Sequence, residues 1–315
     1  MNSNRLFLIG IHFLLLCIFF FFISYIFRLL SLFYIKFNVL IYLFFDLSFV
    51  FFLIFSFLTI LNFILKRKIS SSDEKRWLTI KPIINPRICV AMTAYNDEES
   101  ISLSIKDFKN REDVIKVIVI DNNSVDRTFE ESINSGAEVI KEPLQGYGAC
   151  CIRALKEANK TDCNIICLVE GDGTFSGSDL KKLVSYIENA DMVIGTRTTR
   201  ELNTPDSQMN LFMLWGNVFM SKLLQMRFWK VRLTDLGCTY RIIRKEALEK
   251  IIDSLSVIGN HFLCEMTILA LEKNLKVIEI PITFKKRIGT SKGVGRNIFK
   301  GFITGMKMWY LIMFK

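Results

Sequence analysis

The stretch CLVEGDGTFSGSDL, residues 167–180, ends an apolar run with two acids, Glu170 and Asp172, which are separated by a single glycine. Such a stretch is either an ordinary acidic turn or a site for a divalent cation. Both carboxylates can converge on one ion, and Mg²⁺ or Mn²⁺ is commonly held by one or two carboxylates together with substrate phosphates. Glu170 and Asp172 are therefore candidate ligands of Mg²⁺ or Mn²⁺, which would offset the charge of a departing diphosphate.

The sequence around this turn alternates between short apolar, β-branched runs and segments with helical spacing. Nearly continuous apolar runs predict buried strands, and their alternation with helices predicts a mainly parallel sheet that is covered on both faces. The predicted fold class is therefore α/β. The five predicted strands are 87–95, 114–124, 137–143, 164–173 and 190–197, and the four predicted helices are 96–108, 126–136, 146–159 and 178–189.

Polar residues follow four of the predicted strands at the point where each strand ends. In open sheets of this kind, ligands bind at the carboxyl ends of the strands, which share one edge of the sheet. One polar turn carries little weight, but four on the same edge predict a binding site. The clusters are Asn96 to Glu99, Asp121 to Ser124, Glu170 to Asp172, and Thr196 with Arg197.

Two common nucleotide-binding loops are missing from the sequence. A dinucleotide-binding Rossmann domain requires GxGxxG directly after its first strand, where this chain has TAYNDEES at residues 93–100. No GxxxxGK[ST] loop occurs either. Instead, Gly146 and Gly148 of QGYG start a predicted helix, where free backbone N–H groups can approach a phosphate.

Further charged residues gather in the last third of the chain. Asp235, Gly237 and Arg241 lie in a segment that is too polar for a core and is flanked by strand-like residues. Downstream, FKKRIGTSKGVGR is a basic loop that is either a solvated face or a clamp for an anion such as a diphosphate. Its cations are Lys285, Lys286, Arg287, Lys292 and Arg296.

Two apolar segments near the N-terminus are long enough to cross a bilayer at about 20 residues per span. Residues 6–27 carry no charge, and residues 37–65 carry only Asp46. The first run is too long for a cleaved signal peptide, and no small-residue cleavage site follows it. We predict a membrane hairpin, and the basic cluster from Lys66 to Lys68 predicts that the rest of the chain faces the cytoplasm.

The composition limits which binding partners are expected, and the sequence pattern divides the chain into four predicted parts. The formal net charge of +10 is divided among clusters, some of which flank apolar segments, so an anionic membrane surface is favoured over nucleic acid. Eight cysteines without a CxxC pair and only two histidines make a structural zinc site improbable and indicate a reducing compartment. The last twenty residues predict a helix in the membrane interface, with core packing as the alternative. The predicted domains are a membrane hairpin at 1–68, a linker at 69–86, a catalytic domain at 87–290, and a basic loop with an amphipathic juxtamembrane helix at 291–315.

Several stretches, in their order and spacing, resemble the family 2 glycosyltransferases, in particular the polyprenyl-phosphate sugar synthases related to dolichol-phosphate mannose and glucose synthases. The resemblance runs from about Arg87 to Gly301. It implies a GT-A fold and an inverting transfer of a hexose from a UDP- or GDP-sugar to undecaprenyl or dolichyl phosphate. The matching stretches are AYNDEES, VIDNNSVDRT, GYGACCIRAL, EGDGT, VIGTR, GN at 216–217, TDLGCTYRIIRKEAL, CEM and EIPITFKKRIGTSK.

The resemblance also implies roles for individual residues. EGD takes the place of the family's DxD motif, with Glu170 instead of the usual first Asp, and Asn122 stands where the family often has Asp. The residues implied to bind the donor are Ala94, Tyr95, Asn96, Glu98, Asp121, Asn122, Gly148, Glu170 and Gly171. Those implied in catalysis or phosphate binding are Asp172, Arg197, Asp235, Arg241, Lys285, Arg287 and Lys292.

Two other functions stay open from the sequence. Polysaccharide synthases that extend a glycan have QxxRW, whereas QMRFW at residues 225–229 lacks the arginine at the fourth position. A non-catalytic membrane scaffold with a transferase fold is disfavoured because the acids and arginines named above are present. No sequence feature decides whether the chain forms a homo-oligomer.

Overall fold

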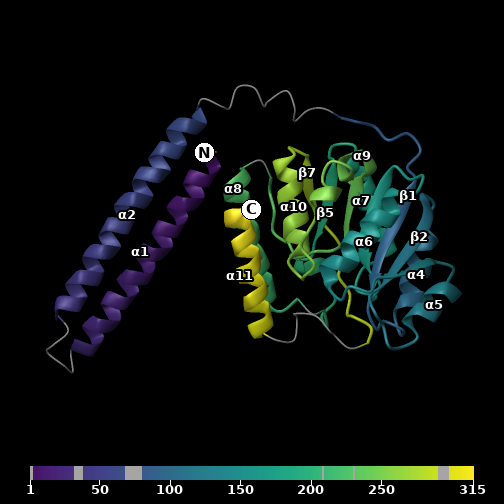
Figure 1. Cartoon of the computed structure of the whole chain (residues 1–315), viewed down its shortest axis with the longest axis horizontal. Helices are drawn as coiled ribbons and strands as arrows, with labels where there is room; N and C mark the ends of the chain where they lie inside the picture. The colour runs from purple at the N-terminus through teal and green to yellow at the C-terminus, as the bar shows by residue number, and fades with distance from the viewer. Residues whose placement is uncertain (1–2, 32–37, 68–79, 208, 230, 290–297) are drawn as a thin grey trace. The chain divides into compact units, whose positions relative to one another are not determined.

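The computed structural model describes residues 3–31, 38–67, 80–207, 209–229, 231–289 and 298–315 (Figure 1). The chain divides into two compact units, one of residues 1–78 with 226–229 and the other of residues 79–225 with 230–315. The predicted site residues that are described all lie in the second unit.

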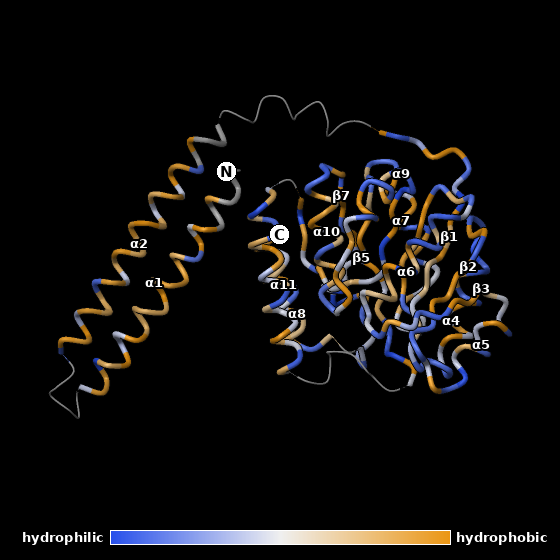
Figure 2. Tube along the Cα trace, in the orientation of Figure 1, coloured by the Kyte–Doolittle hydropathy of each residue, from blue (hydrophilic) through white to orange (hydrophobic). Residues whose placement is uncertain are grey.

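The first unit contains two long helices, α1 (Ser3–Ser31) and α2 (Asn38–Arg67), which pack against each other. Ser48 on α2 donates a hydrogen bond to the carbonyl oxygen of Cys17 on α1 at 2.9 Å. Apolar residues cover both helices along most of their length (Figure 2). The helices are long and apolar enough to cross a membrane, judged by length and composition, within Ile9–Ser31 and Asn38–Asn62.

The second unit is built on a sheet that has seven strands within the described residues. They are β1 (Ile88–Ala94), β2 (Val114–Asp121), β3 (Glu138–Lys141), β4 (Ile165–Glu170), β5 (Met192–Thr196), β6 (Arg241–Arg244) and β7 (Val277–Pro281). Their order is β3-β2-β1-β4-β6-β5-β7. All neighbours are parallel except that β6 is antiparallel to both β4 and β5. The predicted α/β class and mainly parallel sheet are confirmed, and β6 and β7 are additional to the five predicted strands.

Helices connect the strands and cover the sheet (Figure 1). They are α4 (Ile101–Lys109), α5 (Thr128–Asn134), α6 (Tyr147–Asn159), α7 (Leu180–Ile187), α8 (Leu211–Phe228), α9 (Lys245–Leu248), α10 (Phe262–Glu272) and α11 (Ile298–Phe314), with short 3₁₀ turns η2 (Gly177–Asp179), η3 (Arg200–Leu202) and η4 (Ile252–Ser254). α4, α6 and α7 pack on strands, and α10 packs on α6 and α11. α4 begins five residues after the predicted start at 96, because Asn96 has a left-handed backbone with a φ of 50°.

The centre of the core is β1, in which every residue is buried. β4 beside it is also buried from Ile165 to Val169. Strands that are covered on both faces have no solvent side, which explains why their sequences are nearly continuous apolar runs rather than alternating ones.

The topology brings the predicted polar clusters to one edge of the sheet. β1, β2 and β4 are parallel to one another, and β5 runs in the same direction as β4 because β6 is antiparallel to both. The carboxyl ends of these four strands therefore meet at one edge, where ligands bind in open α/β sheets.

α11 has one buried and one exposed side. Its buried side packs against α10, where Cys264 Sγ lies 4.0 Å from the carbonyl oxygen of Met308. An exposed aromatic side is typical of a helix in a membrane interface. The buried residues are Met308, Leu311 and Ile312, and the exposed ones include Phe299, Phe302, Tyr310 and Phe314.

Candidate active site

The acidic turn follows β4 directly. Glu170 is the last residue of the strand, and Asp172 is 3% exposed two residues later. The Asp172 carboxylate accepts hydrogen bonds from the backbone N–H and the hydroxyl of Thr174, at 3.0 and 2.6 Å. Gly171 lies against α4, and a Cβ there would be 2.3 Å from Ile101 Cδ1. A side chain at Gly171 would therefore require the buried Ile101 side chain or the turn to shift.

Arg287 forms ion pairs with carboxylates from two different strand ends. Its Nη2 lies 2.8 Å from Asp97 Oδ1, and its Nη1 lies 3.2 Å from Asp172 Oδ2. The backbone beside it is also attached to the turn, because the N–H of Ile288 donates to the carbonyl oxygen of Asp172 at 3.2 Å. The basic loop therefore reaches the acidic turn through Arg287.

The other cations of this loop are placed differently. Lys285 is half-buried, and its backbone N–H donates to the carbonyl oxygen of Thr174 at 2.8 Å. Lys286 is exposed, with its Nζ 3.5 Å from Asp206 Oδ2. Lys292 lies outside the described residues. Among the loop cations that the structure describes, only Arg287 has an ion pair with the turn.

Two buried acids at this edge of the sheet, Asp172 and Asp97, have raised pKa values. Burial, with the neighbouring Glu170 carboxylate, raises the pKa of Asp172 to about 6, although Arg287 acts in the opposite direction. Burial also raises the pKa of Asp97, against the lowering effects of the Tyr95 N–H and Arg287. Negative charge is thus concentrated where water is largely excluded, so a cation binding here would be stabilised.

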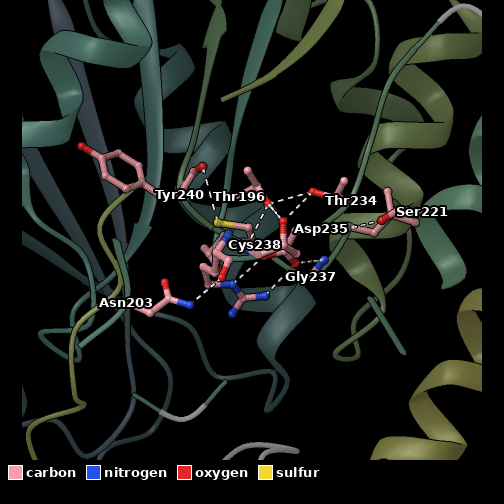
Figure 3. A network of polar contacts seen from close by, with 12 residues as sticks. Thr196, Asn203, Ser221, Thr234, Asp235, Gly237, Cys238 and Tyr240 are labelled. Atoms are coloured by element: carbon pink, nitrogen blue, oxygen red, sulfur yellow. Dashed lines mark hydrogen bonds and ion pairs between the residues drawn. The ribbon is translucent and has the colours of Figure 1, made fainter. Parts of the chain in front are cut away.

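Arg197 and Asp235 form a second ion pair at the end of β5. Arg197 Nε and Nη2 donate to Asp235 Oδ2 and Oδ1 at 2.8 and 2.9 Å, so the pair is bidentate. Burial disfavours the charge, but Asp235 raises the pKa of Arg197 above its ordinary value and keeps the guanidinium charged. Asp235 lies in a polar network with Thr196, Thr234 and others (Figure 3).

Glu279 on β7 fixes Asp235, and the sequence analysis did not single it out. Its carboxylate accepts hydrogen bonds from the backbone N–H groups of Thr234 and Asp235, each at 2.8 Å. The available signal is a single acid inside the apolar strand VIEIP, because a buried carboxylate requires compensating donors.

Arg241 does not lie where the predicted phosphate-binding role requires, and that prediction is corrected. Its side chain is fully buried on β6. The guanidinium donates to the carbonyl oxygens of Cys238 and Leu263 at 2.6 and 3.2 Å, and to Thr267 Oγ1 at 3.3 Å. Burial lowers its pKa. Arg241 therefore joins β6, its preceding segment and α10, rather than presenting a cation to a ligand.

The loops after β1 and β2 are tied together by the predicted donor-binding residues. Asn96 Oδ1 accepts a hydrogen bond from the N–H of Val125 at 2.8 Å, and Glu98 Oε2 accepts one from the N–H of Arg127 at 3.1 Å. The remaining members of this group are placed as follows: Ala94 is buried, Tyr95 is 39% exposed, and Asp121 is 1% exposed with its Oδ1 3.4 Å from the Ser124 nitrogen.

Asn122, Gly146 and Gly148 are occupied by contacts within the protein. Asn122 donates to the carbonyl oxygens of Glu142 and Leu144, and its Oδ1 accepts the N–H of Gly146 at 2.9 Å. The N–H of Gly148 donates to the carbonyl oxygen of Ile258 at 2.8 Å. The expectation of free N–H groups at these two glycines is therefore corrected.

Thr239 and Tyr147 are two further residues that the sequence analysis missed. The Thr239 hydroxyl lies 2.5 Å from both Glu170 Oε1 and the Tyr147 hydroxyl. Neither residue stands out in the sequence, because threonine and tyrosine are common in turns and helices. Their relation to Glu170 depends on three separate elements meeting.

The donor set fits a divalent cation that is completed by a substrate. Among the residues that the structure describes, no cluster of three or more metal-binding side chains occurs. Glu170 and Asp172 provide carboxylate oxygens at one strand end, where Asp172 is nearly fully buried. This matches Mg²⁺ or Mn²⁺ chemistry, in which protein carboxylates supply part of the shell and phosphates the rest.

Comparison with known proteins identifies the fold and then the family. The solved structure of glucosyl-3-phosphoglycerate synthase from Mycobacterium tuberculosis, in complex with Mn²⁺, uridine diphosphate and phosphoglyceric acid, matches 72% of this chain and 78% of that one, with a TM-score of 0.53 and 16% identity. The second unit thus has a GT-A fold, with a mostly parallel mixed sheet. Residues 89–252 match glycosyl transferase family 2, and the chain belongs to this family. It is a glycosyltransferase.

Two relatives in sequence have more specific names. The chain is 28% identical over 226 residues to the low-salt glycan biosynthesis hexosyltransferase Agl6 of Haloferax volcanii, covering 70% of this chain and about half (53%) of that protein. It is 24% identical over 220 residues to the undecaprenyl-phosphate mannosyltransferase of Micrococcus luteus, covering 66% of this chain and 88% of that protein.

Proposed function

We propose that this chain transfers a hexose from a nucleotide-diphosphate sugar to a polyprenyl phosphate, with inversion at the anomeric carbon. The observation that carries the proposal is the meeting of Asp172, Asp97 and Arg287 at the carboxyl ends of the strands. These groups offer both a cation site and a fixed guanidinium to a diphosphate. The name of the Micrococcus luteus relative supports a polyprenyl phosphate as the acceptor.

The donor end is formed by the loops after β1, β2 and β4. Asp172, with Glu170, would hold Mg²⁺ or Mn²⁺, and the bound ion would offset the charge of the leaving nucleoside diphosphate. Mn²⁺ is bound together with uridine diphosphate in the structural relative, which supports this choice of cofactor. The donor is a UDP- or GDP-hexose.

Two arginines supply positive charge to the reaction. Arg287 reaches both acids of the donor end and can transfer its hydrogen bonds to phosphate oxygens. Arg197 is held in one orientation by Asp235, and 13% of its side chain is exposed. An acceptor phosphate is already anionic at neutral pH and needs no strong general base. Catalysis therefore consists of orienting the phosphate oxygen and neutralising the leaving group.

The membrane anchor would be the pair α1 and α2, with the catalytic unit on the cytoplasmic side, where nucleotide sugars are available. The basic cluster at residues 66–68 supports this orientation. The exposed aromatic side of α11 supports its placement in the interface, close to the head group of a lipid acceptor. The boundaries proposed for the four parts remain 1–68, 69–86, 87–290 and 291–315.

The test uses full-length protein in detergent with Mn²⁺, C55 polyprenyl phosphate and a panel of UDP- and GDP-sugars. Release of nucleoside diphosphate is measured for the wild type, for Asp172→Ala and for Asp162→Ala, a control in which an exposed acid is removed. Release that requires the lipid and Asp172 but not Asp162 supports the proposal. Lipid-independent release indicates hydrolysis or another acceptor, and no release together with no metal-dependent nucleotide binding indicates a scaffold.

A further inference from the structure

Glu170 accepts the last of two consecutive hydrogen bonds, and the donor and acceptor of each bond are fixed. Thr239 donates its hydroxyl proton to Glu170 Oε1 at 2.5 Å. A threonine hydroxyl has one proton to donate. The second contact of Thr239, with the Tyr147 hydroxyl at 2.5 Å, must therefore have Tyr147 as the donor. The direction is from Tyr147 through Thr239 to Glu170.

These two hydrogen bonds connect three elements that are distant in the sequence. Glu170 ends β4, Tyr147 is the first residue of α6, and Thr239 precedes β6. Thr239 is 1% exposed, so water does not compete effectively for its hydroxyl. Burial also raises the pKa of Tyr147 well above its ordinary value, which keeps the phenol protonated and able to donate.

The segment from Asp235 to Thr239 contacts two different candidate site residues, Arg197 and Glu170. Asp235 holds Arg197 through a bidentate ion pair, and Thr239, four residues later, holds Glu170. Residues 235–239 therefore orient both a guanidinium at the end of β5 and a carboxylate at the end of β4.

A glutamate has particular need of such an anchor. Its side chain has one more rotatable bond than that of aspartate, and ordering it when a ligand binds costs rotamer freedom. A hydrogen bond that fixes the carboxylate before the ligand arrives removes part of this cost, which strengthens binding.

We propose that Thr239, itself held by Tyr147, is the positioning residue that orders the Glu170 carboxylate for the divalent cation and the donor diphosphate. This role rests on the proposed function. Because the shorter aspartate would not extend to Thr239, the need for the Thr239 hydroxyl is specific to a chain that has glutamate at this position.

The experiment measures the dissociation constant of Mn²⁺ in the presence of UDP or GDP by calorimetry, on full-length protein in detergent. Thr239→Val removes the hydroxyl while keeping the shape, and we expect the dissociation constant to rise roughly tenfold. Thr239→Ser should restore binding to within about twofold, because the hydroxyl is retained. Tyr147→Phe should weaken binding in the same direction but less. Thr161→Val, a matched change at a half-buried threonine that bonds the Ala158 carbonyl, should have no effect.

The decisive comparison repeats Thr239→Val in Glu170→Asp protein, where no further loss is expected. An unchanged dissociation constant in Thr239→Val overturns the proposal, and so does an equal loss with Glu170 and with Glu170→Asp, which would indicate a general structural role. If Thr239→Val does not fold, an unchanged constant in Tyr147→Phe overturns it instead.

The same measurement separates this proposal from the proposed function. A wild type that neither binds Mn²⁺ with a nucleotide nor releases nucleoside diphosphate contradicts the proposed function itself. A wild type that binds Mn²⁺ in an Asp172-dependent manner, with Thr239→Val equal to it, contradicts only the positioning role.

Discussion

Arg197 donates three hydrogen bonds to Asp235, one from its backbone and two from its guanidinium, although the residues are 38 positions apart in the sequence. Asp235 is completely buried. This pair orients the arginine rigidly, because the enclosed carboxylate cannot turn toward water and accepts both guanidinium donors. The cation at the end of β5 is thus fixed by the segment that precedes β6, the next strand in the sequence.

Removing Asp235 should destabilise the protein as well as inactivate it. Asp235→Ala leaves a buried guanidinium without its counter-ion, which costs about 3 kcal/mol of unfolding free energy. Denaturant unfolding of the detergent-solubilised protein measures this loss. The control is Asp206→Ala, which removes the acid of an exposed pair with Lys286 and should cost less than about 1 kcal/mol. Equal stabilities of the two variants would contradict the assigned role of Asp235.

Replacing Arg241 should affect stability before it affects substrate binding. Arg241→Leu leaves the carbonyl oxygen of Cys238 without the donor that bonds it at 2.6 Å, and removes the weaker contact with Leu263, at a cost of about 2 kcal/mol. The KM for the donor and the acceptor should stay within about threefold in the folded fraction, a change of less than 1 kcal/mol. Arg200→Ala, at an exposed arginine, is the control. A large rise in KM with unchanged stability would instead support the phosphate-binding role.

A methyl group at Gly148 should disturb the packing of α6 on the segment beside it. A Cβ at Gly148 would lie 2.1 Å from the carbonyl oxygen of Val257, so Gly148→Ala should destabilise the protein by about 2 kcal/mol. At Gly216 in the exposed part of α8, nothing lies within 4 Å of an added Cβ. Gly216→Ala should therefore stabilise α8 by up to about 1 kcal/mol. The midpoint of thermal unfolding should fall for Gly148→Ala and rise for Gly216→Ala. A shift of both midpoints in the same direction would contradict the close packing assigned to Gly148 and the open surroundings assigned to Gly216.

Glu265 on α10 should make stability depend on acid pH. Burial opposes its ionisation, but the ion pair with Lys315 and the hydrogen bonds from Val257 and Ser256 lower its pKa below the ordinary 4.5. The folded state therefore holds this proton less tightly than the unfolded state, so the stabilisation is present above about pH 4.5 and is lost as the pH falls below it.

Unfolding midpoints of the wild type and Glu265→Gln, measured from pH 3.5 to 7, test this expectation. The wild type should be more stable at pH 7, and the difference should shrink below pH 4.5, the ordinary value for this group. A difference that is constant across the range would show that ionisation of Glu265 contributes nothing.

Local patterns predicted most of the fold and part of the site. Strands β1 and β4 were predicted because their burial on both faces leaves a continuous apolar run, which is visible in the sequence itself. The acids after β4 were predicted because the sequence changes abruptly from apolar to charged residues where that strand ends. The antiparallel β6 was not predicted, because its four residues, RIIR, carry charges at both ends.

The sequence by itself determined the alternation of strands and helices, the two apolar helices and the acidic turn at Glu170 and Asp172, because each depends on residues close together in the chain. Only the tertiary structure decided which arginine reaches the turn. Arg241 and Arg287 both stand in polar segments, yet the first is enclosed by α10 and the second pairs with Asp97 and Asp172. Burial and ion pairing depend on which distant elements meet, and that information is not contained in the spacing of neighbouring residues.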